Sequence, residues 1–95
     1  MKVKARYFAH VREIVGKSEE TFDVPSGTTA QAFLTMLSQK YGEAFRDYVF
    51  SKESDEPSPN VNFLLDGKNV NTMKGTETIL YEGSSFAILP PVGGG

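Results

Sequence analysis

The chain of 95 residues contains no cysteine and no tryptophan, and its only histidine is His10. Without cysteine, the chain can form neither a disulfide nor a thiolate metal site, and it has no cysteine nucleophile. A single histidine has no second imidazole with which to share a metal ion, and His10 has no oriented partner for general-base catalysis. We therefore expect His10 to lie at the surface without a chemical role.

The chain also lacks a long hydrophobic run and a strong excess of one charge. Lys and Arg number 10, Asp and Glu number 12, and the formal net charge is −2. Because no stripe of Lys and Arg is present, nucleic acid is not expected as a main partner. The opening segment MKVKARYF alternates charged and apolar residues, which is typical of neither a signal peptide nor a membrane span. These patterns predict a cytoplasmic protein without a nucleic-acid or membrane partner.

Motifs for catalysis and for cofactor binding are missing as well. Residues 51–60 (SKESDEPSPN) are polar and contain two prolines, which predicts an exposed, mobile loop. The acidic residues Glu53, Asp55 and Glu56 of this loop lack the spacing and the central glycine of a calcium loop. The chain has no Ser-His-Asp set and no phosphate-binding loop. We therefore expect no bound cofactor or metal ion, and no enzymatic activity of the chain on its own.

Alternating apolar and polar residues predict strands at both ends of the chain. A hairpin is expected first, then a helical segment, then three further strands. The Asp66-Gly67 pair is typical of the tight turn in a hairpin. Pro90 ends the last strand because it has no backbone N–H to donate to a ladder. The expected strands are residues 2–11, 20–24, 61–65, 68–71 and 85–89.

One helix pattern, over residues 28–41, is strong. We expect it to begin with a capping box formed by Thr28 and Gln31 and to end at Gly42 in a left-handed C-cap. The apolar stripe of this helix consists of Ala30, Phe33, Leu34, Leu37 and Tyr41. A shorter helical turn is indicated by the spacing of Phe45, Tyr48 and Val49. In the irregular segment that precedes the last strand, Ile79 and Leu80 are expected to pack against the core.

The order of these elements predicts an α+β fold with one main helix on a mixed sheet of about five strands. Both termini then come from strands, and pairing them side by side gives a parallel pair at the centre of the sheet. This arrangement is the β-grasp, or ubiquitin-like, topology. We expect a single domain of residues 1–89, which includes the exposed loop 51–60, followed by a flexible tail of residues 90–95.

Two segments resemble a known family. The opening VKARYFAHVREIVG resembles the first strand and turn of the MoaD-type small subunit of molybdopterin synthase, and FAILPPVGGG resembles the closing strand and tail of that family. The resemblance is specific at these two ends and otherwise extends to the order of the elements. Related thiamine sulfur carriers and archaeal protein modifiers also end in Gly-Gly, so a modifier or a thiamine-type carrier remains an alternative.

The resemblance implies a particular chemistry for the C-terminus. An adenylating enzyme of the ubiquitin-activating type uses ATP to activate the carboxylate of Gly95, which a sulfur donor then converts to a thiocarboxylate. The large subunit of molybdopterin synthase accepts this sulfur. If the last glycine is not native, the reactive carboxylate belongs to Gly94. Because the chain has no cysteine, an exchangeable sulfur can be carried only at the terminal acyl group.

The residues of the tail suit insertion into a narrow passage. Gly94 and Gly95 have no side chains to collide with its walls, and they tolerate positive φ. Pro90 and Pro91 hold the preceding segment extended, which lowers the entropy lost on insertion. Fully extended, the tail spans about 20 Å. A frayed end is the alternative for the glycines taken alone, because termini are commonly disordered.

A docking surface is expected beside this tail. Phe8 and Leu89 are predicted on the open face of the sheet, where large apolar residues are either ordinary surface scatter or a contact patch. The resemblance favours the contact patch, because the family uses apolar residues at these two positions. Arg12 is either a further charged contact or a solvated turn residue. The expected partner-binding residues are Phe8, Arg12, Leu89, Pro90, Pro91, Val92 and Gly93. A passive interaction module with an unreactive end is the remaining alternative.

Overall fold

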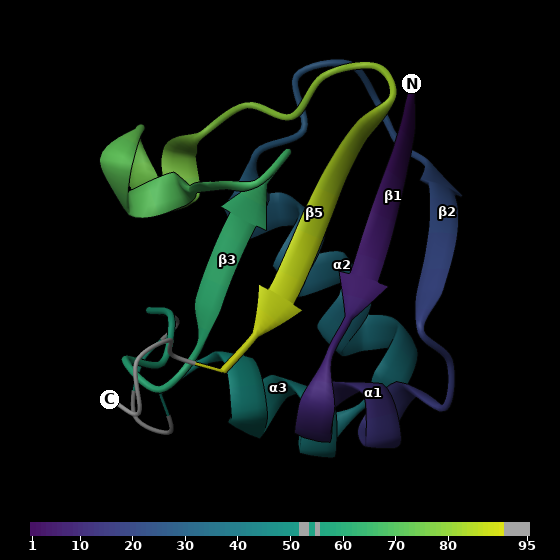
Figure 1. The fold of residues 1–95 in the computed structure, drawn as a ribbon, viewed down its shortest axis with the longest axis vertical. Coiled ribbons are helices and arrows are strands. Elements are labelled where there is room, and N and C mark those ends of the chain that lie inside the picture. The colour runs from purple at the N-terminus through teal and green to yellow at the C-terminus, as the bar shows by residue number, and fades with distance from the viewer. Residues whose placement is uncertain (52–53, 55, 91–95) are drawn as a thin grey trace.

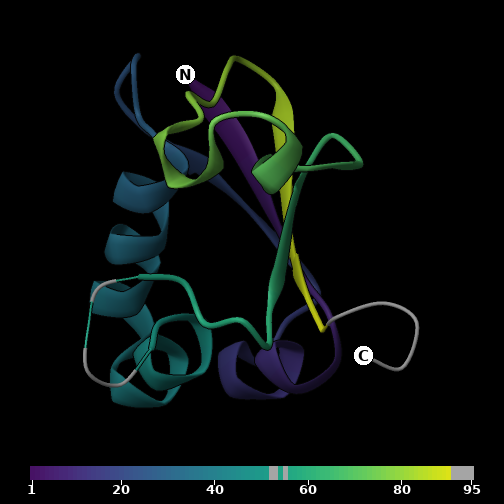
Figure 2. The same cartoon turned by 90° about the vertical axis from the view of Figure 1, so that its left-hand side faces the viewer.

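The computed structural model of the chain describes residues 1–51, 54 and 56–90. The described residues form a five-stranded mixed sheet with the strand order β2-β1-β5-β3-β4. Figure 1 shows four of these strands side by side, in the order β2, β1, β5 and β3. Helices cover one face of this sheet, and among the described residues the other face carries none (Figure 2). The strands are β1 (Lys2–Tyr7), β2 (Glu19–Asp23), β3 (Asn62–Leu65), β4 (Lys68–Asn69) and β5 (Ser84–Leu89). The helices are α1 (Ala9–Val15), α2 (Ala30–Tyr41) and α3 (Glu43–Val49), with two 3-10 turns, η1 (Val70–Thr72) and η2 (Gly75–Glu77).

The first and last strands of the sheet form its central pair. β1 and β5 run parallel from Val3 opposite Ser84 to Tyr7 opposite Ile88, and β2 and β3 flank them in antiparallel pairing. The fold is therefore the β-grasp arrangement that the sequence predicts. Parallel strands need a long connection between them, and here this connection contains α1, α2 and α3 as well as the three other strands, β2, β3 and β4.

The core lies between the sheet and the helices. On β1, the alternate residues Val3, Ala5 and Tyr7 are buried, while the residues between them are exposed. The Phe86 ring on β5 contacts Phe33 of α2 edge to face, with a centroid distance of 5.6 Å, and it stacks on Phe63 of β3 at 5.7 Å. Such aromatic pairs add to the burial of apolar area and fix how α2 crosses the sheet.

The first strand is shorter than the sequence predicts. The expected strand over residues 2–11 ends at Tyr7, and the helix α1 begins at Ala9. The chain turns at Ala9, whose φ of +52° is in the left-handed region. Val11 is buried on the core side of α1, and Ile14 packs against the core one turn later. The spacing of Val11 and Ile14 is helical. The strand was predicted to continue past Tyr7 because the alternation of residues 2–9 is typical of a strand.

The start of α2 also differs from the prediction. Thr29, not Thr28, is the N-cap, and its hydroxyl accepts a hydrogen bond from the backbone N–H of Ala32 at 3.1 Å. The Thr28 hydroxyl instead donates to the Pro25 carbonyl at 2.7 Å. Gln31 is therefore one position too early to complete a capping box with Thr29.

The end of α2 and the start of α3 share one residue. Gly42 has a φ of +87°, as expected, but its ψ of −165° is not that of a left-handed cap. Its N–H donates to the Ser38 carbonyl at 2.8 Å, while its own carbonyl accepts from the N–H of Arg46 at 3.1 Å. Gly42 thus joins two helices directly, and the expected second helical turn is confirmed as α3.

The irregular segment between β4 and β5 is only partly as predicted. The strand expected over residues 68–71 is limited to Lys68–Asn69, because Val70 begins a 3-10 turn. Leu80 is buried, as expected, but Ile79 is 60% exposed, so its predicted packing against the core is wrong. The backbone here is extended, because Ala30 donates to Thr78 and Leu80 donates to Thr28, and neighbouring side chains therefore point to opposite sides.

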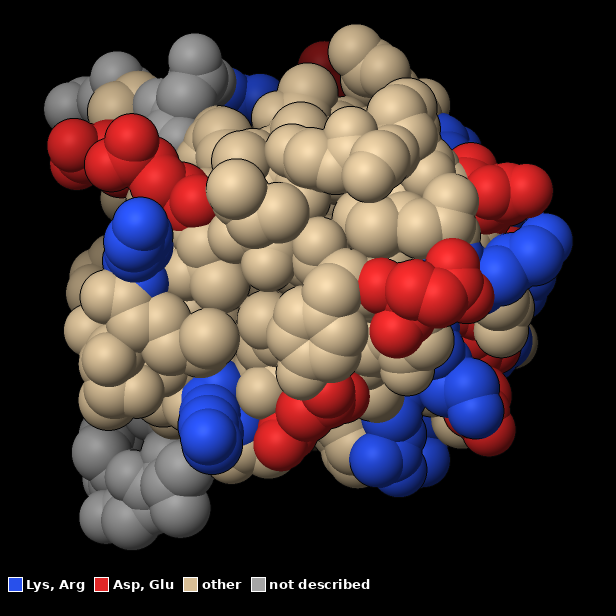
Figure 3. All heavy atoms as spheres, turned by 90° about the horizontal axis from the view of Figure 1, so that it is seen from above, with Lys and Arg blue, Asp and Glu red and all other residues tan. Residues whose placement is uncertain are grey.

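The end of the molecule that carries this segment is largely uncharged at its surface. Viewed from above, uncharged side chains form a broad area with charged residues around it (Figure 3). The exposed large apolar residues of the described chain are Met73, Ile79 and Tyr81, all in the segments at this end. Within the described residues, no helix is both long and apolar enough to cross a lipid bilayer.

Candidate functional site

The sheet face that carries no helix is built from alternate residues of β1, β5 and β3. Arg6 of β1 is in register with Ala87 of β5, which in turn is in register with Leu64 of β3. Because successive side chains of a strand point to opposite faces, these three lie opposite the core residues Tyr7, Phe86 and Phe63. We call this surface the open face.

The structure brings Phe8 and Leu89 to the same end of the open face. The N–H of Phe8 donates to the Ile88 carbonyl at 3.2 Å, which extends the parallel ladder by one residue beyond β1. Leu89 is the last residue of β5 and is in register with Asn62 of β3. Both side chains are half-buried. Their placement on one face is as predicted, although Phe8 adjoins a helix rather than continuing a strand.

Two further apolar residues belong to this surface and were missed in the sequence. Leu64 and Ala87 are half-buried on the open face, next to each other across the β3–β5 pairing. Together with Phe8 and Leu89 they form what we call the apolar patch. Leu64 lies between buried Phe63 and Leu65 in an apolar run, so its outward direction follows only from the register of the strands.

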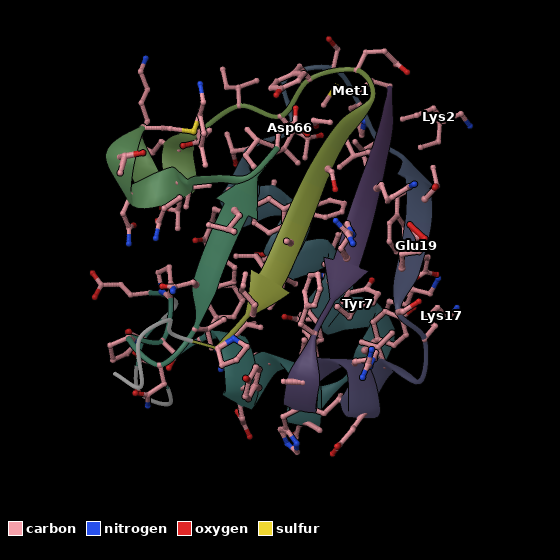
Figure 4. All side chains as sticks on the ribbon, in the orientation of Figure 1. Met1, Lys2, Tyr7, Lys17, Glu19 and Asp66 are labelled. Atoms are coloured by element: carbon pink, nitrogen blue, oxygen red, sulfur yellow. The ribbon has the colours of Figure 1, made fainter. Side chains whose placement is uncertain are left out.

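Cations line the open face beyond the apolar patch. Lys4 pairs with Glu19 of β2 at 3.1 Å, and Lys2 pairs with Asp23 at 3.4 Å. Figure 4 labels one residue of each pair, Glu19 and Lys2. The N-terminal ammonium group also contacts Asp23, and hydrogen bonds from this ammonium and from Lys2 lower the pKa of the Asp23 carboxyl. The Arg6 guanidinium instead lies over the Phe8 ring, 5.3 Å from its centroid.

Pro90, the first residue after β5, is exposed. β5, whose last residue is Leu89 of the apolar patch, points toward the end of the sheet where α1 and α3 lie (Figure 1). Arg12 is exposed on α1, and among the described residues nothing joins its side chain to Phe8 or Leu89. The other predicted tail residues lie outside the described residues: Pro91, Val92, Gly93, Gly94 and Gly95.

The largest cluster of titratable groups lies away from the open face and is structural. Glu20 of β2 accepts hydrogen bonds from the hydroxyls of Tyr7 and Tyr41, and its second oxygen is 2.7 Å from Lys40 and 3.4 Å from Lys17. Partial burial alone raises the pKa of Glu20, but the hydrogen bonds from Lys40, Tyr41 and Tyr7 outweigh it and lower this pKa to about 2.

Burial, followed by the charge of Glu20, strongly raises the pKa of the Tyr7 hydroxyl. Glu20 therefore stays ionised and Tyr7 neutral at ordinary pH, with both oxygens of Glu20 occupied. Such a cluster fixes α2 to β2 and offers neither a free base nor a free acid.

Neither a metal site nor a catalytic histidine is found in the part of the chain that the structure describes. No group of three His, Cys, Asp or Glu residues there could hold a metal ion. His10 is exposed, as predicted, with its Nδ1 atom 3.5 Å from a Glu13 oxygen and its ring 5.3 Å from that of Tyr48. The arrangement as a whole is suited to docking and to presenting a chain end.

Comparisons with known proteins show the family and the fold to which the chain is similar. The model of the ThiS family matches residues 5–95. Small archaeal modifier protein 3 from Haloferax volcanii is 32% identical to this chain over 95 residues, which is the full length of both. The solution structure of small archaeal modifier protein 1 from Methanosarcina acetivorans has a TM-score of 0.83 at 33% identity, and covers 99% of this chain and 96% of that one. A Pyrococcus furiosus structure assigned as molybdopterin converting factor, subunit 1, has a TM-score of 0.78 at 27% identity, and covers 97% and 99% of the two chains.

Fold and open face thus define a small ubiquitin-like protein of the β-grasp type. More narrowly, the chain belongs to the ThiS family, whose members are ubiquitin-like modifiers or sulfur carriers and not enzymes by themselves. The resemblance seen in the sequence is confirmed at this level. The similarity to an archaeal modifier supports a modifier role as much as a role in molybdopterin synthesis.

Proposed function

We propose that the chain is a sulfur carrier whose terminal residue, Gly95, holds a thiocarboxylate used for molybdopterin synthesis. The observation that carries the proposal is the position of β5. This strand is central in the sheet, it ends beside the apolar patch, and six residues from Pro90 to Gly95 follow it in the sequence. Extended, these residues reach about 20 Å. Residues 1–89 can then dock outside a partner while residues 90–95 enter its active site.

The proposed chemistry takes place on the partners. In the adenylating enzyme, a carboxylate oxygen of Gly95 attacks the α-phosphorus of ATP and expels pyrophosphate, which leaves an acyl adenylate. A sulfur nucleophile then attacks the acyl carbon and AMP leaves, so that sulfur replaces one oxygen. Exclusion of water protects the adenylate from hydrolysis, and a narrow entry for the tail serves this purpose. The large subunit of molybdopterin synthase receives the sulfur. The chain binds no cofactor itself in this scheme, and both partners act in the cytoplasm.

Residues of the tail and of the open face have separate roles in this proposal. Gly94 and Gly95 give the clearance that the narrow entry requires. Pro90 and Pro91 set the direction of exit, because the φ of each proline is fixed. Phe8 and Leu89 dock the domain against the partner. The other residues proposed to contact a partner are Arg12, Val92 and Gly93.

Intact-mass measurement tests the carrier function. After incubation with the adenylating enzyme, ATP and a sulfur donor, the chain is expected to gain about 16 Da, since sulfur replaces oxygen. Without ATP the mass should stay unchanged. Fragmentation should place the gain on Gly95, and a chain that ends at Gly94 shows whether the additional glycine is required. An unchanged mass under all conditions contradicts the proposal and favours a passive interaction module.

A protein-modifier function is the second candidate, because a modifier protein is 32% identical to this chain over its full length. The same acyl adenylate would then be attacked by a lysine amine of a target, which forms an isopeptide bond. A tagged copy expressed in its own cells separates the two candidates. Conjugates that resist reducing agents and that yield a branched lysine peptide on digestion support the modifier. Co-purification with the large synthase subunit and loss of molybdopterin on gene deletion support the sulfur carrier.

A further inference from the structure

We propose that Arg6 is a specificity-determining docking residue, which binds a carboxylate that the adenylating enzyme presents beside an apolar side chain. The inference rests on the proposed function, because that function supplies the enzyme. It adds the chemistry of the contact: one buried apolar pair on the apolar patch and one ion pair directly next to it.

The charge of Arg6 is not balanced within the sheet. Its neighbours on the same strand, Lys2 and Lys4, are each paired with an acid of β2. Among the described residues, Arg6 has no ion pair and no side-chain hydrogen bond, and its only recorded partner is the Phe8 ring. Glu19 is in register directly opposite Arg6, yet its carboxylate binds Lys4. The guanidinium therefore keeps its donors available although an acid is close.

The guanidinium is also held in place before any partner binds. Arg6 lies in the middle of β1, which is paired on one side with β2 and on the other with β5. Its guanidinium carbon is 5.3 Å from the centroid of the Phe8 ring, a cation–π distance that restricts the long side chain. Less side-chain entropy is then lost on docking, which favours affinity.

The surroundings of Arg6 favour a carboxylate as its partner. A guanidinium presents its N–H groups as a planar fork that matches the two oxygens of a carboxylate. Ala87 is next to Arg6 in one row of the sheet, and Leu64 follows Ala87 in the same row, so docking on the apolar patch is expected to remove water from the position of Arg6. Charge pairs strengthen when water is removed, provided that each charge is matched. An acid on the partner therefore fits, and an apolar or basic group leaves Arg6 buried without a partner.

The adenylating enzyme is the partner that fits this position best. Sulfur transfer and protein modification have different recipients, but both need the same activation step. Leu89 of the apolar patch is the last residue of β5 before the tail, so an enzyme that holds Gly95 is brought close to the patch. A contact that serves both candidate functions is one with the adenylating enzyme.

Steady-state ATP–pyrophosphate exchange, with the adenylating enzyme from the same genome and the full chain as substrate, tests the inference. Arg6→Glu should raise the KM for the chain tenfold or more with kcat within about twofold, since the residue acts in docking and not in chemistry. Arg6→Lys keeps the charge but loses the fork, and should raise KM about threefold. The matched control is Lys68→Glu, which makes the same change in net charge at an exposed lysine of β4 outside the apolar patch. Its KM should stay within about twofold of the wild type.

The possible outcomes are distinguishable. If Arg6→Glu and wild type have equal KM, or if Lys68→Glu has the same effect as Arg6→Glu, the inference is overturned while the proposed function stands. If Arg6→Glu is activated normally and fails only in delivery of sulfur, the carboxylate belongs to the recipient and the inference is wrong. If the wild-type chain supports no exchange, the proposed function itself fails. Thermal unfolding of each variant verifies the fold, and Arg6→Gln, with an expected rise in KM of about threefold, replaces any variant that unfolds.

Discussion

At the scale of single residues, the Glu20 side chain is important for stability because it forms hydrogen bonds and ion pairs with several other elements. It joins β2 to Tyr7 of β1 and to Tyr41 and Lys40 of α2, and its side chain is only 13% exposed. A carboxylate that accepts several hydrogen bonds holds a lowered pKa, and its charge then stabilises the folded state.

Replacing Glu20 by Gln is expected to lower the free energy of unfolding at pH 7 by about 2 kcal/mol. The amide still accepts a tyrosine hydrogen bond, but it loses the charge that pairs with Lys40 and Lys17. Urea unfolding at pH 7 measures this loss. Glu13→Gln, at an exposed residue whose recorded ion pair is with His10, is the control and should change stability by less than about 0.5 kcal/mol.

The same cluster gives the protein an acid dependence with a defined sign. Because the pKa of Glu20 falls from 4.5 to about 2 on folding, its contribution is complete above pH 4.5 and is lost as the pH falls toward 2. The difference between wild type and Glu20→Gln should therefore shrink steadily over this interval. A difference that stays constant down to pH 2 would show that Glu20 acts through shape and not through charge.

At the scale of elements, α1 depends on two residues with left-handed backbone. Ala9, at its start, has a φ of +52°, and Gly16, at its end, has a φ of +86° and donates its N–H to the Arg12 carbonyl at 2.8 Å. A side chain in this region costs about 1–2 kcal/mol, which glycine avoids. The backbone is therefore strained at Ala9, where α1 begins, and unstrained at Gly16, where α1 ends.

Opposite substitutions at these two residues should have opposite effects on stability. Gly16→Ala is expected to lower the free energy of unfolding by about 1 kcal/mol. Apart from the residue itself and its two chain neighbours, no atom lies within 4 Å of the added methyl group, so this cost is conformational and not a clash with the rest of the protein. Ala9→Gly should raise stability by about 0.5 kcal/mol, because relief of strain is partly offset by the greater freedom of glycine in the unfolded chain. Denaturant unfolding of both variants is the measurement, and a shift of the same sign in both contradicts this account.

Elements with a strong local pattern were predicted from the sequence, and elements that depend on distant contacts were not. The five-stranded β-grasp sheet and α2 follow from alternation, from helical spacing and from Pro90 as a stop. The helix α1 was missed because strand-like alternation continues through Phe8 and Ala9, and only backbone geometry ends it. Ile79 was misplaced because an extended backbone directs neighbours to opposite sides.

The candidate site was likewise predictable only where it depends on local alternation within one strand. Phe8 and Leu89 were expected on one face, since each is at a fixed parity in its strand. Leu64, Ala87 and the free charge of Arg6 could not be derived, because they depend on which strands are neighbours and on which acid each cation binds. The Glu20 cluster joins residues 13 and 21 positions apart, a separation beyond any local motif.

At the scale of the whole molecule, we propose that residues 1–89 and the tail of residues 90–95 act separately. The core of the described residues ends at Ile88 on β5, and the domain measures 31 × 27 × 24 Å. A tail that reaches about 20 Å is thus comparable to the smallest dimension of the domain. Deep insertion of the tail therefore requires no opening of the core.

Removal of Gly94 and Gly95 should separate stability from function. The shortened chain is expected to unfold within about 2 °C of the wild-type midpoint, since no core residue is lost. It should not gain mass with adenylating enzyme, ATP and sulfur donor. Calorimetry and intact-mass measurement verify the two parts. A midpoint lowered by many degrees would mean that these glycines stabilise the fold. This result would contradict the proposal that the tail serves only to present Gly95 to a partner.

The central position of β5 has a mechanical consequence. Tension applied at Pro90 passes into a strand that pairs with β1 from Ser84 to Ile88 and with β3 from Phe86 to Leu89. These bonds run across the direction of pull, so they bear the load together in shear and do not open one after another as at a sheet edge. A force that a partner applies to the tail while binding or releasing it is therefore expected to leave the sheet folded.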